Sequence, residues 1–202
     1  LLDLPVISEL LECLIGNPNL LKARKEKYEV PLPTFRLDHI NVHTHVQKGF
    51  EGGRLHGGWN GTAGLYRYDN GVMYNGLTTV SFELFDTKPN NGGFACIPGS
   101  HKANVQLPEK WRDLSTGVNE CIERVAAKPG DAIIFTEALT HGTLPWEVDE
   151  KRTTVFYKFS PHALTWSADF FNPDDFVGYE DMDRRKLALL EKPNARYPQR
   201  PR

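Results

Sequence analysis

The chain has 202 residues, a formal net charge of -2 at pH 7, and 40% hydrophobic and 25% charged residues. These values suit a globular protein with a sizeable core, and they give no electrostatic reason to expect nucleic acid or an anionic membrane as a partner. The three cysteines are widely spaced and form no CxxC pair, which favours a reduced, cytoplasmic compartment over a disulfide framework.

The chain opens with an apolar repeat at helical spacing. Leucine and isoleucine recur at nearly every third or fourth position from Leu1 to Ile15, and Gly16-Asn17-Pro18 ends the pattern, so we expect an amphipathic helix. Acidic residues interrupt the repeat and no basic region precedes it, so we expect neither a signal peptide nor a membrane span. The chain starts without methionine, and we expect some N-terminal sequence to be missing.

From Val30 onward, short β-rich runs alternate with glycine, proline and asparagine. The expected strands are 35–46, 77–85, 94–97, 132–135 and 153–159. The Asn91-Gly92-Gly93 turn predicts a hairpin between the second and third of these strands. A helical turn is expected within 107–121 and a short helix within 181–190. We therefore predict one mainly β domain over 1–202, a sandwich or barrel with flanking helices.

A histidine follows the strand predicted over 132–135. In the segment PGDAIIFTEALTHGTLPW, His141 is preceded by Glu137 and Thr140 and followed by Gly142 and Thr143. A histidine just past a buried strand can point into the mouth of a barrel and bind a metal through one ring nitrogen, while the other nitrogen is held by a neighbouring group. The alternative interpretation is a hydrogen-bonded structural histidine.

Arg152 lies eleven positions after His141, at the head of RTTVFYKFSP. Strand alternation places Arg152, Thr154, Phe156 and Lys158 on one face. An arginine at the start of a strand is commonly a solvated edge charge. Its functional interpretation is a fixed fork for a carboxylate, because the guanidinium group donates two parallel hydrogen bonds to a planar anion.

The remaining histidines have structural interpretations at this stage. His101 falls in the turn Pro98-Gly99-Ser100-His101, which we expect to face solvent. His43 and His45 share one face of a strand at period two, where such a pair could line a cavity, bind metal, or simply be exposed or hydrogen-bonded. We favour the last interpretation for them and for His39.

Taken together, these segments resemble the phytanoyl-CoA dioxygenase (PhyH-like) family of iron(II)- and 2-oxoglutarate-dependent oxygenases. The matching pieces are NGGFACIPGSHKAN, PGDAIIFTEALTHGT and the arginine eleven positions after the histidine. His56, in RLHGGWNGTAG, lies 85 positions before His141, as the first metal histidine of such a domain would. The resemblance implies a double-stranded β-helix, a jelly-roll or cupin-like barrel with iron in its mouth.

The resemblance also implies roles for four residues. His56 and His141 would be iron(II) ligands, and Arg152 would bind the distal carboxylate of 2-oxoglutarate with help from the Thr143 hydroxyl. The implied reaction is the oxidative decarboxylation of 2-oxoglutarate coupled to hydroxylation of an unactivated carbon in a small organic or acyl substrate. On this interpretation, the protein is a dioxygenase in which His56, His141 and Arg152 are catalytic.

The sequence departs from the family at the carboxylate ligand. The family shows His-x-Asp, whose aspartate completes a facial triad, but position 58 is glycine. The first explanation is that chloride enters the vacated position, as in 2-oxoglutarate halogenases with Gly or Ala there. The second is that another carboxylate reaches the metal, and Glu137, Glu83 and Asp86 are the candidates. The third is a degenerate site in a non-catalytic barrel used for binding.

The residues implied to bind 2-oxoglutarate help to choose between an oxygenase and a non-catalytic barrel. Two neutral histidines alone would hold iron(II) more weakly than a facial triad does. However, Arg152 and Thr143 are both present, and a degenerate site has no need of them. We therefore favour the oxygenase over the non-catalytic barrel.

Overall fold

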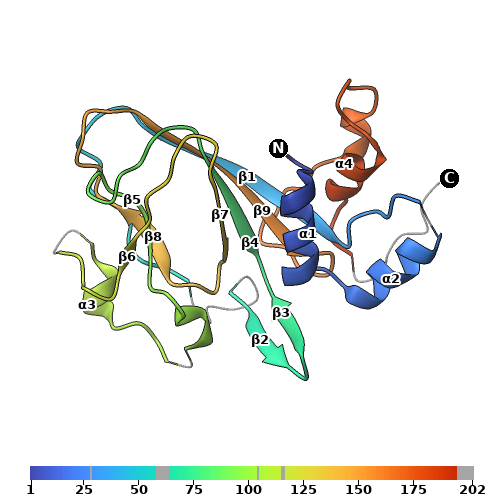
Figure 1. The fold of residues 1–202 in the computed structure, drawn as a ribbon, viewed down its shortest axis with the longest axis horizontal. Coiled ribbons are helices and arrows are strands. Elements are labelled where there is room, and N and C mark those ends of the chain that lie inside the picture. Colours follow the sequence, from blue (N-terminus) through green and yellow to red (C-terminus); the bar gives the residue numbers. More distant parts are fainter. Residues whose placement is uncertain (28, 58–63, 104, 115–116, 195–202) are drawn as a thin grey trace.

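A four-stranded antiparallel sheet forms the backbone of the computed structural model, which describes residues 1–27, 29–57, 64–103, 105–114 and 117–194 (Figure 1). In spatial order its strands are β1 (Phe35–His45), β9 (Arg152–Pro161), β4 (Thr78–Glu83) and β7 (Ala132–Thr136). Strands far apart in the chain are thus neighbours in the sheet, since β9 pairs with both β1 and β4.

A second, three-stranded sheet faces the same interior. Its spatial order is β6 (Glu123–Arg124), β5 (Gly93–Cys96) and β8 (His141–Leu144). A separate hairpin is formed by β2 (Tyr66–Asp69) and β3 (Val72–Asn75). The architecture is mainly β with flanking helices, as predicted.

The helices are α1 (Pro5–Leu14), α2 (Pro18–Lys27), α3 (Glu109–Arg112) and α4 (Arg184–Leu189), with 3-10 turns η1 (Ser100–Lys102) and η2 (Pro173–Phe176). Helices α1 and α4 pack on the outer face of the large sheet, whereas α3 lies beside the small sheet (Figure 1). Figure 1 shows α1 and α4 on the same side of the sheet. The core there consists of Leu11, Ile15, Phe35, Leu37, Val80, Phe82, Phe159, Leu189 and Leu190. No helix within the described residues is long and apolar enough to cross a membrane.

Strand β4 shows how the sheet separates its two faces. All six of its residues are buried, with Val80 and Phe82 packed in the helix-side core and Ser81 and Glu83 on the opposite face. Because alternate residues of a strand point to opposite faces, the inner face of this sheet is both buried and polar. Buried polar groups require partners, so this face is where a functional site is expected.

The predicted hairpin around Asn91-Gly92-Gly93 is wrong. Strands β4 and β5 do not pair, because β4 lies in the large sheet and β5 in the small one. Gly92 and Gly93 have positive φ angles of 102° and 87°, and a Cβ on Gly92 would lie 1.9 Å from the Pro145 carbonyl oxygen. The glycines allow the chain to cross between sheets at close approach.

The hairpin of β2 and β3 was missed, although Asn70-Gly71 connects two aromatic-rich runs. Both turn residues have positive φ angles, 49° and 78°. This is the usual composition of a two-residue hairpin loop, so the signal was present in the sequence. The second helix, α2, was also not anticipated.

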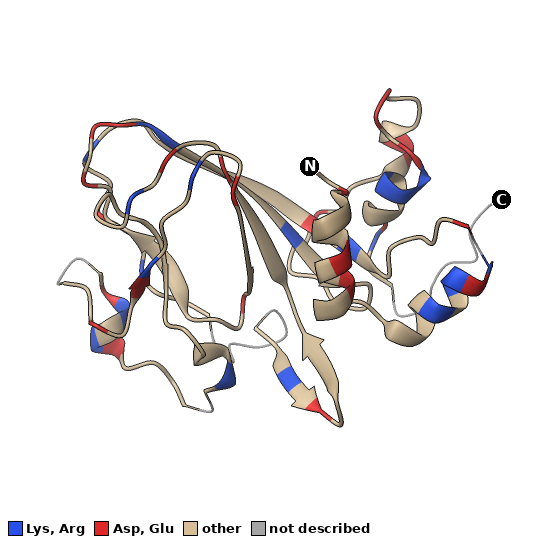
Figure 2. Cartoon of the chain, viewed as in Figure 1, with Lys and Arg blue, Asp and Glu red and all other residues tan. Residues whose placement is uncertain are grey.

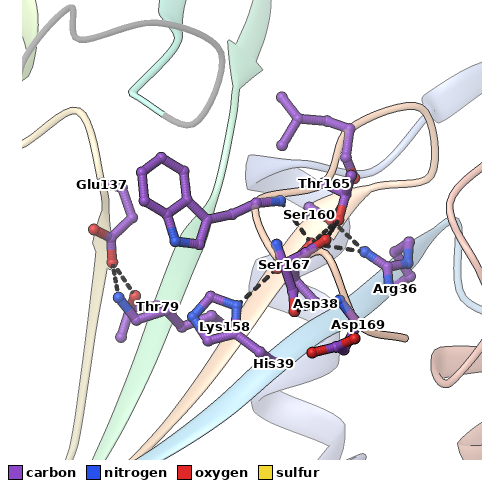
Figure 3. Close-up of polar contacts among 12 residues, drawn as sticks. Arg36, Asp38, His39, Thr79, Glu137, Lys158, Ser160, Thr165, Ser167 and Asp169 are labelled. Carbon is purple, nitrogen blue, oxygen red and sulfur yellow. Dashed lines mark hydrogen bonds and ion pairs between the residues drawn. The ribbon is translucent and has the colours of Figure 1, made fainter. Parts of the chain in front are cut away.

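Asp38 joins β1 to the segment that follows β9. It lies at an irregularity in the β1–β9 register and is fully buried. Its carboxylate accepts hydrogen bonds from Arg36, His39, Thr165 and the backbone N–H groups of Trp166 and Ser167 (Figure 3). Burial alone would raise the pKa of Asp38, but the hydrogen bonds from His39 and the two backbone donors hold it well below its usual value of 3.8.

Replacing Asp38 with Asn should destabilise the fold. The variant leaves the fully buried Arg36 without its ion-pair partner, which costs about 3–5 kcal/mol when one member of a buried pair is removed. Urea unfolding of wild type and variant at pH 7 measures this difference. Asp69→Asn, at an exposed position in β2, should change stability by about 0.5 kcal/mol or less.

The difference in unfolding free energy between wild type and Asp38→Asn should depend on pH. A carboxyl whose pKa is depressed in the folded state contributes stability that is fully present above its unfolded pKa, here near 3.8, and is lost as pH falls through the folded value. The gap between wild type and Asp38→Asn should therefore narrow below pH 3.8. A gap that stays constant down to acid unfolding would contradict the role of the ionised carboxylate.

Candidate metal centre

Charged residues are rare on the large sheet, where most of the ribbon in Figure 2 is uncharged. The charged residues within its four strands are Arg36, Asp38, Glu83, Arg152 and Lys158. Strand β9 places Arg152, Thr154, Phe156 and Lys158 on one face, as predicted, and β4 lines up Glu83 opposite Thr154. The inner face therefore carries an organised row of polar groups.

His56 and His141 are brought together by a short backbone bridge. The N–H of His56 donates to the carbonyl of His141 at 2.9 Å, and the N–H of His141 donates back at 2.8 Å. The ring centroids lie 4.3 Å apart. Glu137 joins them, with its Oε2 3.6 Å from His141 Nε2. One potential ligand atom from each of the three residues lies within 4.8 Å of the others.

Hydrogen bonds orient both imidazole rings. Nδ1 of His141 lies 2.7 Å from the Leu139 carbonyl oxygen, and Nδ1 of His56 lies 3.2 Å from that of Arg54. A carbonyl oxygen only accepts, so Nδ1 carries the proton in each ring. This leaves Nε2 unprotonated in each neutral ring, which is how protein histidines are commonly prepared for metal binding.

Glu137 is held by one oxygen only. Its Oε1 accepts hydrogen bonds from Lys158 Nζ at 2.8 Å and from Thr79 Oγ1 at 2.5 Å (Figure 3). The other oxygen, Oε2, faces His141. One oxygen thus fixes the carboxylate and the other remains directed at the two histidines.

Electrostatics set the protonation states that a metal requires. Burial lowers the pKa of His141 to about 4, so the ring is neutral at pH 7. Burial by itself would raise the pKa of Glu137, but attraction to His141 and Lys158 outweighs it and holds this pKa below its usual value. Two imidazoles and one carboxylate form the donor set of a facial triad, so these residues fit iron(II) or a similar divalent metal.

Arg152 is not a solvated edge charge. It is 1% exposed and forms an ion pair with the equally buried Glu83, Nη2 to Oε1 at 3.2 Å. Its Nε and Nη1 have no hydrogen-bond partner among the described residues. Arg152 and Thr143 line the same small cavity as His56 and His141, so the structure brings together all four residues singled out in the sequence.

The other carboxylates considered for the metal lie elsewhere. Glu83 is bound to Arg152 and to the hydroxyls of Ser81 and Thr154, and Asp86 is exposed. Gly58, where the family has its aspartate, lies outside the described residues. Among the three alternatives, the geometry favours Glu137.

His43 and His45 share one face of β1, where His43 is exposed and His45 is half-buried. His43 lines the cavity and its ring lies 4.8 Å from that of Phe156. Burial, with the nearby charge of Arg152, lowers the pKa of both His43 and His45. Their shared face was predicted, whereas their place beside Arg152 was not. His101 packs edge-on against Tyr66 beside η1.

Lys158 is the site residue that sequence reasoning missed. Strand alternation already placed it on the face of Arg152. What the sequence did not indicate was that the turn after β7 would bring Glu137 back to it. The approach depends on the pairing of β4 with both β7 and β9, which is a long-range property of the fold.

The model of the phytanoyl-CoA dioxygenase (PhyH) family matches residues 4–153. This match covers well over half of the chain. The chain therefore belongs to this family, which is one of iron(II)- and 2-oxoglutarate-dependent oxygenases. No curated protein sequence matches the chain.

Solved structures show the same fold. HygX from Streptomyces hygroscopicus, bound to nickel, 2-oxoglutarate and hygromycin B, matches with a TM-score of 0.64 at 20% identity, covering 82% of this chain and 66% of HygX. Its iron-bound structure matches with a TM-score of 0.62 at 20% identity, covering 79% and 65%. EvdMO1 matches with a TM-score of 0.53 at 21% identity, covering 79% and 31%. The chain thus spans about two thirds of HygX, and the predicted jelly-roll class is confirmed.

Metal affinity should depend on Glu137. Glu137→Gln keeps the shape of the side chain but removes its charge, so affinity for Ni(II) should fall roughly tenfold or more. Isothermal titration calorimetry measures this, with circular dichroism to check the fold because Lys158 loses its partner. Asp86→Asn is the matched control and should bind as wild type does. Unchanged affinity in folded Glu137→Gln would exclude Glu137 as a ligand.

Proposed function

We propose that this protein is an iron(II)- and 2-oxoglutarate-dependent oxygenase that hydroxylates an unactivated carbon of a small organic or acyl substrate. The observation that carries the proposal is the convergence of His56, Glu137 and His141 beside a buried arginine whose Nε and Nη1 have no partner in the described part of the chain. Family membership supports the same reaction class.

His56, Glu137 and His141 would hold iron(II) through Nε2, Oε2 and Nε2. Iron(II) held there would supply the chemistry that couples oxidative decarboxylation of 2-oxoglutarate to oxidation of the substrate. Lys158 and Thr79 keep the carboxylate in place from the side away from the histidines.

Arg152 would bind the distal carboxylate of 2-oxoglutarate, with Thr143 as a second donor. Arg152 is buried and unpartnered at Nε and Nη1 among the described residues, and both side chains line the cavity that His56 and His141 also line. A buried guanidinium keeps its charge and offers several donors to a planar anion. The arrangement also weighs against a barrel without catalytic function.

Glu137 favours hydroxylation over halogenation. A halogenase needs a vacated ligand position for chloride, and here a carboxylate oxygen faces the histidines from the turn after β7. The glycine at position 58 then has no bearing on the ligand count. HygX is known with hygromycin B bound, which supports a small molecule as the substrate here as well.

Anaerobic addition of iron(II) and 2-oxoglutarate should produce the weak visible charge-transfer band of a chelated complex. His141→Ala should abolish the band, and Arg152→Gln should weaken 2-oxoglutarate binding roughly 100-fold, as the loss of a desolvated charge contact does. Arg67→Gln, at an exposed site in β2, is the control. Absence of both the band and 2-oxoglutarate turnover in the wild type would refute the proposal.

Chloride separates the two reaction types. If Glu137 fills the third ligand position, the band of the wild type should be indifferent to chloride, whereas Glu137→Ala should acquire a chloride-dependent shift. Spectra recorded with chloride and with sulfate at equal ionic strength provide the comparison. A chloride-dependent shift in the wild type would favour the halogenase.

A further inference from the structure

A second carboxylate, Glu83, lies beside the proposed cosubstrate anchor and has no part in the metal centre. It comes from the end of β4, directly opposite Thr154 of β9, and is 1% exposed. Its presence is unexpected, because a negative charge next to Arg152 opposes the binding of another carboxylate there. Glu83 does not itself favour anion binding, so its buried position beside Arg152 needs another explanation.

Three hydrogen bonds fix Glu83. Oε1 accepts from Ser81 Oγ at 2.9 Å and from Arg152 Nη2 at 3.2 Å, and Oε2 accepts from Thr154 Oγ1 at 2.7 Å. The two hydroxyl groups supply two of these three hydrogen bonds, so Arg152 supplies only one. Glu83 therefore takes only a small part of what the guanidinium can donate.

The guanidinium is only partly engaged as a result. Arg152 Nε and Nη1 are buried and have no partner among the described residues. Burial lowers the pKa of Arg152, and the charge of Glu83 opposes this shift. A buried cation without any counter-ion would be strongly destabilising, so Glu83 compensates the charge while Arg152, which lines the cavity, keeps Nε and Nη1 without a hydrogen-bond partner among the described residues.

We infer that Glu83 is a resident counter-ion that tunes how tightly Arg152 binds carboxylates. It keeps the empty site neutral, and an incoming carboxylate must share the guanidinium with it. The affinity for 2-oxoglutarate is thereby held below what Arg152 alone would give, and succinate, the product, leaves more readily. This inference rests on the proposed function for the identity of the ligand, but not for the anion site itself.

Glu83→Gln provides the test, since the amide retains the size of the side chain and removes its charge. In the variant, the buried guanidinium lacks a counter-ion, and a ligand carboxylate supplies one. The dissociation constant of 2-oxoglutarate, measured anaerobically through the charge-transfer band, should fall about tenfold. An unchanged or weaker affinity would overturn the inference and leave Glu83 as a structural support only.

A second measurement needs neither iron nor turnover. Acetate should raise the melting temperature of metal-free Glu83→Gln and have little effect on the wild type, because ligands that bind only the folded state stabilise it. Asp38→Asn is the matched control. This variant also removes the counter-ion of a buried arginine, Arg36. Arg36 does not line the cavity beside the metal centre, so acetate should not raise the melting temperature of this variant. Equal effects of acetate on both variants would overturn the inference.

Thr154→Val covers the case in which Glu83→Gln fails to fold. Without the Thr154 hydroxyl, Oε2 of Glu83 loses its donor and turns toward Arg152, so 2-oxoglutarate should bind more weakly than in the wild type. Tighter or equal binding would overturn the inference. If the wild type gives no band at all, the proposed function fails, whereas acetate rescue of Glu83→Gln still reports on the anion site.

Discussion

The charged groups on the inner face of the large sheet are largely buried, and each of them needs a partner. Three ion pairs meet this requirement: Arg36 with Asp38, Lys158 with Glu137, and Arg152 with Glu83. An unpaired charge in such surroundings costs several kcal/mol. The outer face of the same strands packs against α1 and α4, so a shift of one residue in register would expose apolar groups and bury unpaired charges together. This requirement fixes the position of each group in the site.

The three pairs serve different ends. Asp38 accepts hydrogen bonds from the backbone of the segment after β9 and so holds this segment against β1. Lys158 holds one oxygen of Glu137 and leaves the other directed at the histidines. Glu83 engages a single nitrogen of Arg152 and leaves two without a partner among the described residues. The Asp38 carboxylate accepts hydrogen bonds at both oxygens, although Arg36 Nη2, like two nitrogens of Arg152, has no partner among the described residues.

Local patterns predicted much of the fold. The alternation in β9 and the strand before Glu137 depend on short stretches of sequence, and each prediction of strand position was close, whereas His56 was singled out only by the family resemblance. The hairpin at Asn91-Gly92-Gly93 was wrong because a glycine turn reports backbone freedom and not which strands it joins. The approach of Lys158 to Glu137, and the burial of Arg152, follow from pairing between strands more than 50 positions apart, which no local pattern contains.

The spacing of Glu137 and His141 has a consequence for the substitutions that the chain accepts beside the metal centre. The segment from the turn after β7 to the first residue of β8 supplies two of the three proposed ligands, whereas the family pattern takes two from the segment around its first histidine. Gly57, directly after His56, packs against this turn, because a Cβ at this position, where φ is 106°, would lie 2.1 Å from the Leu139 carbonyl oxygen. A side chain at position 57 would therefore displace the segment that carries Glu137 and His141, so this glycine couples the first histidine to the other two proposed ligands.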